Sequence, residues 1–421
     1  MLSVAASTLP AYTPSSQVPS YSPEPSSDEL LVEHNPRIKA RVLGGTRITK
    51  SGLDTVVLTN QDPNAEVPSY GRSGLITGFV DLQVREKVSE VVLKLKGKMV
   101  AIIERGSVSN KVLDESYVLW PLPSQNAAAE PCAGSVPFSV VLPAKFQRDD
   151  HAKFPLPASY NASFITMGGS SIKIAYTHCI PRPLTLSVVV TRNRGRKFAA
   201  LLSSKNTTNV PFLHTPLTRP ARPIPSSSSS FLADLKVMPD EWRQSSTVAH
   251  ARPQKATSPS GLASESVDLD LFTPTAGVFA LKDAIPIHVQ LAGSLPSLRE
   301  FIDSTGGTAQ VEVTLVRQLL IQIQGCLEPT RQTLGRVVLD PTPPSFSSSS
   351  PSSKSGAALD WTGSLRCMPG VTVGSFDAGV VKAQDFIVVD VRPSSSTSHF
   401  APIRHSHSIR LVTDSWPDEY T

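Results

Sequence analysis

The sequence predicts an all-β protein that contains two antiparallel β-sandwich domains. The chain has 421 residues, and because single cores rarely grow past roughly 250 residues, two domains are expected. Short alternating apolar runs, separated by Gly, Pro, Asn and Asp, fill two long stretches of the chain. Segments rich in serine and proline surround these stretches, and helical periodicity is nearly absent from the first of them.

Four consecutive segments follow from these patterns. Residues 1–36 are rich in Ser, Pro, Ala and Thr and have few bulky apolar residues, so we expect a disordered arm. Residues 37–205 are predicted to form the first sandwich. Residues 206–268 are rich in proline and serine and are predicted to be the interdomain linker. Residues 269–418 are predicted to form the second sandwich, with a disordered serine-rich loop at 343–357.

The clearest predicted strand covers residues 91–99, where apolar residues and lysines fall on opposite faces. Residues 171–176 and 184–190 show the same alternation. Residues 295–302 are the one helical candidate, and it is short. Strands with a single apolar face are most simply buried by packing two sheets together, which makes a sandwich.

Composition argues against several classes of function. Basic residues are scattered among 35 acidic ones for a formal charge of +5, so no basic stripe marks a nucleic-acid site. The four cysteines lie far apart, without metal or redox spacing, and 405–407 offers two histidines with no third ligand nearby. Residues 44–51 lack the glycine that precedes lysine in a phosphate-binding loop. We therefore expect no enzyme, no catalytic residue, no metal and no cofactor.

The N-terminal residues lack the basic and apolar regions of a signal peptide, and no apolar run reaches the roughly 18 to 20 residues that span a bilayer. A cytoplasmic protein is therefore expected. A carbohydrate-binding or adhesive sandwich would require secretion and is disfavoured for that reason.

Four elements of the first stretch resemble the arrestin-like proteins, in particular the fungal arrestin-related trafficking adaptors of the α-arrestin family. Residues 71–82 resemble the family's Gly-x-Val/Ile-x-Gly-x-Val-x-Leu strand, and residues 88–97 resemble the next strand, which ends in glycine. Residues 136–143 resemble its Pro-Phe-x-x-x-Leu-Pro turn and strand. Residues 156–160 resemble its Leu-Pro-Pro-Ser-Tyr, with Ala158 in place of the second proline. The order and spacing of all four elements match.

This resemblance extends over roughly residues 37–416 and implies two immunoglobulin-like sandwiches of the arrestin N and arrestin C types. It implies a non-enzymatic adaptor that binds membrane cargo proteins and links them to a WW-domain ubiquitin ligase of the HECT type and to endocytic machinery. We expect a monomer in the cytoplasm that is recruited to the plasma membrane or endosomes. The alternative is a scaffold of the same fold that acts in vesicle sorting or signalling without a ligase.

Adaptors of this family recruit ligases through Pro-Pro-x-Tyr or Leu-Pro-x-Tyr segments, in which proline favours the polyproline II backbone that a WW domain binds. The chain has no Pro-Pro-x-Tyr. It has two related segments in the arm, and the candidate binding residues are Leu9, Pro10, Tyr12, Pro19 and Tyr21. The alternative is a tail without a partner. A third segment, residues 67–70, enters a predicted strand and is expected to be structural.

Two basic sets are candidates for a surface that attracts phosphorylated tails or anionic lipid headgroups, with peripheral membrane association as the consequence. They are Lys94, Lys96 and Lys98, and Arg192, Arg194, Arg196 and Lys197. Solvated surface charge, or protection of a sheet edge by lysine, is the favoured alternative, because the sequence does not place the two sets on one face.

Arg317 occupies an apolar-face position in the alternating run of residues 311–323. Either a β-bulge turns it outward, or it is buried and paired with a carboxylate such as Asp385 or Asp390, because an unpaired buried charge is costly. The bulge is the favoured interpretation, and no role is assigned to this residue.

Overall fold

The structure is a computed structural model that describes part of the chain. The expected arm at residues 1–36 lies outside the described residues, as does the expected serine-rich loop at 343–357 except for its last residue. The described residues are 44–86, 88–103, 106–120, 132–148, 151–160, 162–167, 174–181, 184–193, 203–225, 231–252, 265–302, 309–323, 325–342 and 357–416.

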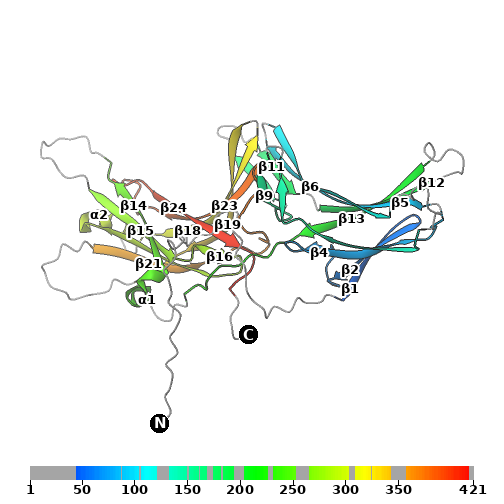
Figure 1. The fold of residues 1–421 in the computed structure, drawn as a ribbon. Helices are drawn as coiled ribbons and strands as arrows, with labels where there is room; N and C mark the ends of the chain where they lie inside the picture. Colours follow the sequence, from blue (N-terminus) through cyan, green and yellow to red (C-terminus); the bar gives the residue numbers. More distant parts are fainter. Residues whose placement is uncertain are drawn as a thin grey trace, which may run out of the picture. The chain divides into compact units, whose positions relative to one another are not determined.

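The first sandwich consists of two mainly antiparallel sheets (Figure 1). The first sheet has the order β1 (Gly45–Ser51), β2 (Asp54–Gln61), β4 (Leu75–Leu82) and β7 (Ser135–Val141). The second sheet has the order β10 (Ala162–Met167), β11 (Ile174–Pro181), β5 (Val88–Ile103), β12 (Leu184–Asn193), β13 (Ser203–His214) and β3 (Ser69–Tyr70), and β6 (Gly106–Trp120) also pairs with β5. A short hairpin of β8 (Lys145–Gln147) and β9 (Lys153–Pro155) lies outside these sheets.

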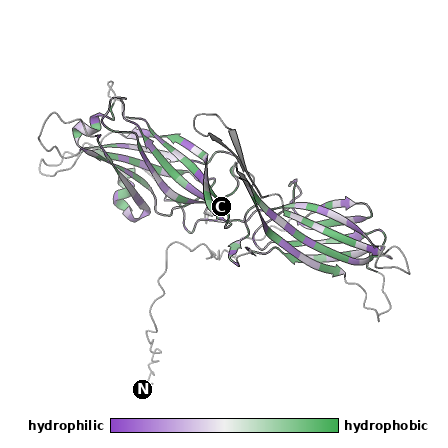
Figure 2. Ribbon diagram, turned by 90° about the horizontal axis from the view of Figure 1, so that it is seen from above, coloured by the Kyte–Doolittle hydropathy of each residue, from purple (hydrophilic) through white to green (hydrophobic). Residues whose placement is uncertain are grey.

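Alternating side chains of the two sheets form the first core. Val91, Leu93 and Leu95 of β5 are buried there, as the sequence pattern predicts, together with Leu186 and Val188 of β12. Figure 2 shows the same alternation of hydrophobic and hydrophilic residues along the strands. The predicted strands at 91–99 and 184–190 are therefore confirmed. The strand predicted at 171–176 begins, among the described residues, at Ile174.

The second sandwich also consists of two sheets. One has the order β14 (Trp242–His250), β15 (Ser266–Pro274), β17 (Ile285–Gly293), β21 (Ala357–Leu365) and β20 (Asp340–Thr342). The other has the order β16 (Val278–Ala280), β24 (Ile403–Val412), β23 (Val381–Val391), β18 (Val311–Ile323) and β19 (Cys326–Val338), and β22 (Phe376–Asp377) pairs with β23. A second core, which includes Trp361 and Phe301, fills the space between these sheets. The predicted all-β fold with two sandwiches is confirmed.

Helices are few and short among the described residues. Helix α2 (Leu295–Arg299) occurs where the sequence predicts a short helix, and Ser294 caps it by accepting a hydrogen bond from the Ser297 amide at 3.3 Å. Helix α1 (Phe231–Val237) precedes a 3-10 turn, η1 (Pro239–Glu241). The Phe231 ring stacks on His288 of β17 at 3.8 Å, so α1 lies against the second sandwich. No described helix has the length and apolar character needed to cross a bilayer.

The linker predicted at 206–268 is wrong at both ends. β13 pairs with β12 from Ser203 to Phe212 and with β3 at Leu213 and His214, so residues up to His214 belong to the first sandwich. β14 pairs with β15, so residues from Trp242 onward belong to the second. Both misplaced strands carry exposed polar residues at alternate positions, and this composition resembles that of a linker. The connection between the sandwiches is therefore residues 215–241 and contains α1.

Candidate functional site

The candidate WW-binding residues Leu9, Pro10, Tyr12, Pro19 and Tyr21 lie outside the described residues. The third segment is structural, as the sequence predicts. Tyr70 lies in β3, its ring meets Phe212 edge-on at 5.5 Å, and its hydroxyl accepts a hydrogen bond from Gln61 Nε2 at 3.1 Å. Burial raises the pKa of Tyr70 to about 12. This tyrosine is part of the core and is not available to a WW domain.

The lysines of β5 lie on its outward face, opposite Val91, Leu93 and Leu95. Lys96 and Lys98 are exposed and Lys94 is half-buried. On the neighbouring strand β6, Asp114 lies directly opposite Lys96 and accepts a hydrogen bond from Lys111 at 2.7 Å, which is the main reason that its pKa is lowered. A carboxylate therefore interrupts this basic strip.

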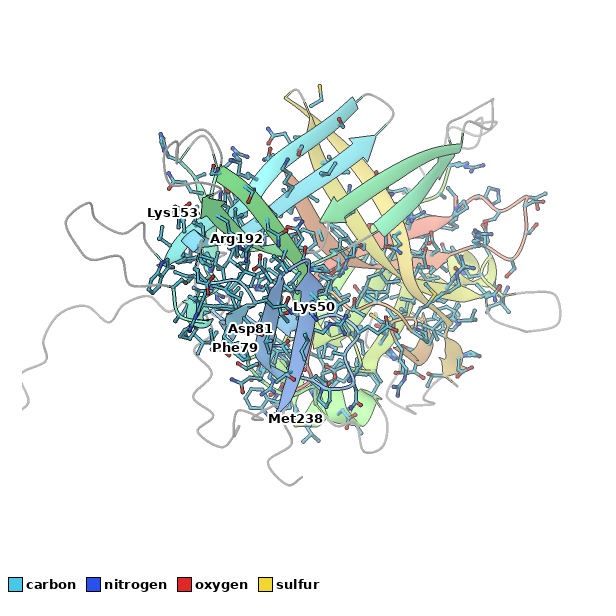
Figure 3. All side chains as sticks on the ribbon, turned by 90° about the vertical axis from the view of Figure 1, so that its right-hand side faces the viewer. Lys50, Phe79, Asp81, Lys153, Arg192 and Met238 are labelled. Atoms are coloured by element: carbon cyan, nitrogen blue, oxygen red, sulfur yellow. The ribbon has the colours of Figure 1, made fainter. Side chains whose placement is uncertain are left out.

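Arg192 does not belong to an exposed basic surface, so its assignment to one is wrong. Figure 3 labels its side chain among those of the first sandwich. Its side chain is 11% exposed and forms an ion pair with the fully buried Asp54. Arg192 Nη1 donates to Asp54 Oδ2 at 2.9 Å, and Nη2 donates to Oδ1. Arg194, Arg196 and Lys197 lie outside the described residues. The lysine strip and the second basic set are therefore not shown to form one surface.

The Asp54–Arg192 pair joins the two sheets of the first sandwich. Asp54 begins β2 in one sheet, and Arg192 lies near the end of β12 in the other. Asn206 of β13 adds hydrogen bonds from its Nδ2 to Asp54 Oδ2 at 2.7 Å and to the Ser51 carbonyl at 2.9 Å. Because each polar group is satisfied by another, this end of the sandwich tolerates a buried charge.

Arg317 is fully buried and paired, so the favoured bulge interpretation is wrong and the alternative of a carboxylate partner is right. It lies directly opposite Asp385 on β23. Nε donates to Asp385 Oδ1 at 2.8 Å, and Nη2 donates to Oδ2 at 2.9 Å. A bulge does occur nearby, but its extra residue is Leu334 on β19, so Arg317 keeps its inward orientation.

Further groups complete this buried cluster. Arg317 Nη1 donates to the Val373 carbonyl at 2.8 Å, and the Ser375 hydroxyl donates to Asp385 Oδ2 at 2.7 Å. Burial opposes the charge of Arg317, but the hydrogen bonds and charge of Asp385 outweigh it and raise the pKa. Burial also raises the pKa of the Cys367 thiol to about 11, which keeps it protonated and unreactive at neutral pH.

Tyr160, the last residue of the segment that resembles Leu-Pro-Pro-Ser-Tyr, lies next to this cluster. Its ring centre is 5.9 Å from the Arg317 guanidinium carbon and 5.8 Å from the Phe376 ring. A cavity of about 330 Å³ lies beside it, and Ser159, Tyr160, Arg317 and Gly370 contribute to its lining. Tyr160 belongs to the first of the two long stretches of β pattern. It thus packs beside strands that belong to the second stretch and hold the Arg317–Asp385 pair.

His214, the last residue of β13, holds the 156–160 segment in place. Its ring Nδ1 lies 2.9 Å from the Pro157 carbonyl, which requires the proton on Nδ1. The backbones of His214 and Ser159 are joined by a further bond of 2.8 Å, and the Ser159 hydroxyl accepts from the His214 amide at 2.9 Å. Burial lowers the pKa of His214, so the ring is neutral at neutral pH.

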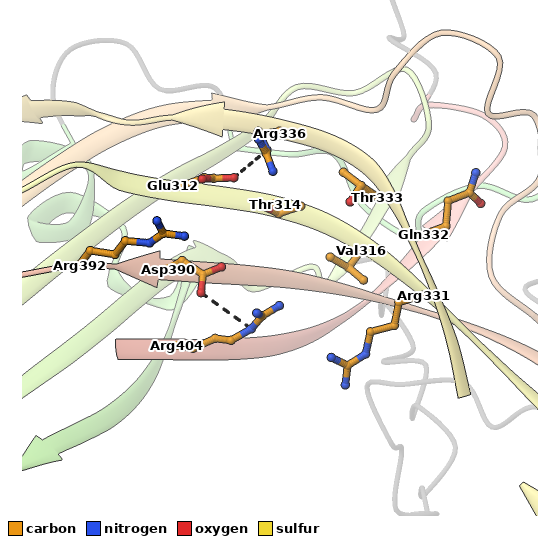
Figure 4. A pocket seen from close by; sticks show the side chains of 10 residues that line it. All are labelled: Glu312, Thr314, Val316, Arg331, Gln332, Thr333, Arg336, Asp390, Arg392 and Arg404. Carbon is orange, nitrogen blue, oxygen red and sulfur yellow. Dashed lines mark ion pairs between the residues drawn. The ribbon is translucent and has the colours of Figure 1, made fainter. Parts of the chain in front are cut away.

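A depression of about 300 Å³ lies on the outward face of β19, β18, β23 and β24 (Figure 4). Thr314 and Val316 are buried at its floor. Four arginines surround it, and two carboxylates lie among them: Arg331, Arg336, Arg392, Arg404, Glu312 and Asp390. Reasoning from the sequence missed this group, because its members come from two pairs of consecutive strands, β18 with β19 and β23 with β24, that are far apart along the chain.

No protein-family model matches the chain, and no curated protein matches it at a significant level. Among the described residues, no group of three or more His, Cys, Asp or Glu side chains is arranged to hold a metal ion. His405 of β24 instead forms a hydrogen bond of 2.8 Å between its Nε2 and the Ser245 hydroxyl. The arrangements described above are exposed charged groups and buried polar clusters.

Proposed function

We propose that the protein is an arrestin-like, non-enzymatic adaptor that binds membrane cargo proteins and links them to a WW-domain ubiquitin ligase and to endocytic machinery. One observation carries the proposal: the four sequence elements that resemble the family all occupy framework positions of the first sandwich. Residues 71–82 lead into and form β4, 88–97 lie in β5, and 136–143 form most of β7 and the turn after it. Residues 156–160 are the segment held by His214.

The glycine of the first element has a clear physical role. Gly78 lies in β4 between β2 and β7, and a Cβ at this position would come within 2.1 Å of the Val57 carbonyl oxygen and 2.8 Å of the Phe138 ring. Only glycine permits this close approach of the strands. The motif is therefore tied to the packing of the sandwich, as expected if the resemblance reflects a shared fold.

The finer assignments belong to the same proposal. The two sandwiches are proposed to be immunoglobulin-like, of the arrestin N and arrestin C types. The protein is proposed to be a cytoplasmic monomer that is recruited to the plasma membrane or endosomes. Its lysine strip on β5 supports an electrostatic contribution to peripheral membrane association.

A pull-down with recombinant WW domains tests the link to the ligase. The wild-type chain is compared with the double variant Tyr12→Ala, Tyr21→Ala, and with Tyr70→Phe as the matched control. Because Tyr70 is buried, we expect Tyr70→Phe to bind like the wild type. We expect the double variant to lose binding. Equal binding by all three proteins would contradict the proposed link.

The second candidate is a scaffold of the same fold that acts in vesicle sorting or signalling without a ligase. Two features of the sequence support this ligase-independent function. The chain has no Pro-Pro-x-Tyr, and the segment at 18–21 begins with valine instead of leucine. This function predicts that the changes at Tyr12 and Tyr21 leave the set of bound partners unchanged.

A further inference from the structure

We propose that the arginine-lined depression on the second sandwich is a docking site for an acidic, carboxylate-rich peptide segment of a partner protein. The class of partner protein that carries this segment follows from the proposed adaptor function, and to that extent the inference rests on it. The site itself is argued from Arg331, Arg336, Arg392 and Arg404 and from the two carboxylates between them.

The carboxylates hold only two of the arginines. Arg336 Nε lies 2.6 Å from Glu312 Oε1, and Arg404 Nε lies 3.8 Å from Asp390 Oδ1. Glu312 and Asp390 are directly opposite each other on β18 and β23, so two like charges meet at the centre of the group. Within the described part of the chain, no carboxylate pairs with Arg331 or Arg392. The depression therefore carries an excess of positive charge.

Its shape suits an extended chain better than a membrane surface. The buried side chains of Thr314 and Val316 form a recessed floor, and the arginines stand at its sides (Figure 4). Gln332 and Thr333 lie at the same rim and offer hydrogen-bonding groups to a peptide backbone. Glu312 and Asp390 would repel densely packed anionic headgroups, whereas the spaced carboxylates of a peptide are able to contact the arginines at the sides and to avoid the two carboxylates at the centre.

Arginine also favours this ligand chemistry. The guanidinium presents a planar pair of N–H donors that matches a carboxylate, so each unpaired arginine is able to hold one incoming carboxylate with two hydrogen bonds. The four arginines are exposed, and the existing ion pair of Arg404 is long, so an incoming carboxylate meets weak competition at Arg404, whereas the short pair with Glu312 competes at Arg336. We expect fast, salt-sensitive binding of an acidic segment.

Fluorescence anisotropy with the full chain tests the site. The probe is a fluorescein-labelled peptide of alternating Asp, Glu and Gly, and the reference peptide has Asn and Gln in place of Asp and Glu. In the double variant Arg331→Ala, Arg392→Ala, we expect affinity for the acidic peptide to fall on the order of tenfold. The matched control Arg47→Ala, Lys50→Ala removes the same charge from exposed positions on β1 of the first sandwich and should change affinity by less than about twofold.

A third variant tests whether the affinity for the acidic peptide also rises when a carboxylate is removed from the depression. Glu312→Gln removes the carboxylate that holds Arg336, so the acidic peptide should bind more tightly. Glu115→Gln, which removes an exposed carboxylate from β6, is the control and should leave affinity unchanged. An equal gain in both variants would mean that only the total charge matters, and it would overturn the proposed site.

Three other outcomes would also overturn the proposal. They are no binding of the acidic peptide, equal losses in the Arg331/Arg392 and control double variants, or an Arg331/Arg392 double variant that binds the peptide normally but binds vesicles of phosphatidylcholine and phosphatidylserine more weakly than the wild type. The test is independent of the ligase. Failure of peptide binding with intact WW-domain binding rejects this site alone. Loss of WW-domain binding with intact peptide binding rejects the ligase link alone.

Discussion

Arg317 and Asp385 lie opposite each other on β18 and β23 and form a doubly hydrogen-bonded ion pair that is entirely buried. Ser375 and the Val373 carbonyl satisfy the remaining polar atoms of the pair. Tyr160 lies beside the guanidinium. The second sandwich therefore encloses a charged pair whose geometry depends on every member being present.

Asp385→Ala should strongly destabilise the second sandwich, because it leaves the Arg317 charge buried without its partner. The expected loss is about 3–5 kcal/mol in the free energy of unfolding. Urea unfolding measures this loss, and hydrogen exchange in β18 and β23 shows which part of the chain opens. The double variant Arg317→Leu, Asp385→Leu should recover most of the stability. If the single variant unfolds at the wild-type urea concentration, the pair is not an essential part of the fold.

Arg192→Ala should destabilise the first sandwich by about 3 kcal/mol, because the fully buried Asp54 loses its cation. Arg192→Lys should not restore stability, because an ammonium group does not make the paired hydrogen bonds of a guanidinium. Lys96→Ala, at an exposed position of the same sheet, is the control and should stay within about 0.5 kcal/mol of the wild type. Similar urea midpoints for Arg192→Ala and Lys96→Ala would contradict this account.

Gly78→Ala should destabilise the first sandwich by about 1–3 kcal/mol, because the added methyl group forces β2 and β4 apart. Gly134→Ala is the matched control, since no atom lies within 4 Å of a Cβ built at that position. Thermal unfolding measures the stability of both variants relative to the wild type. A tolerated alanine at position 78 would show that β2 and β4 do not approach as closely as described.

The stabilising effect of Asp360 should weaken in acid. Burial alone would raise its pKa, but hydrogen bonds from His288 Nε2 and Gln290 Nε2, each 2.9 Å long, outweigh burial and lower it. A lowered pKa means stability that is present above the unfolded value of about 3.9 and is lost as the pH falls through the folded pKa. The difference in unfolding free energy between the wild type and Asp360→Asn should therefore shrink below about pH 4.

Urea titrations at a series of pH values measure this difference. Asp340→Asn changes an exposed carboxylate in the same sheet and is the control. A difference between the wild type and Asp360→Asn that stays constant down to pH 3 would contradict the assignment.

Local sequence patterns predicted most of the fold, because a strand with one buried face alternates visibly along the chain. The alternation of Val91, Leu93 and Leu95 needed no knowledge of their partners. The linker ends were harder, because β13 and β14 carry polar residues at alternate positions and resemble a connection. Their pairing with β12 and β15 depends on tertiary contacts.

The charged clusters were the least predictable part. Asp54 and Arg192 are 138 residues apart, and only the packing of two sheets brings them together. The arginines of the depression come from two strands, β19 and β24, and from the residue that follows β23. For Arg317 the sequence defined two alternatives, but the choice depended on where the bulge lies. The extra residue on β19 leaves its inward position unchanged.

Affinity purification of the full chain from cells, with mass spectrometry of the bound proteins, tests the proposed adaptor function most directly. The wild type is compared with Tyr12→Ala, Tyr21→Ala and with the control Tyr70→Phe. The account predicts that integral membrane proteins and a WW-domain ubiquitin ligase bind to the wild type and to the control. It predicts that only the ligase is lost from the double variant. If neither membrane proteins nor a ligase are enriched with the wild type, the adaptor function is contradicted.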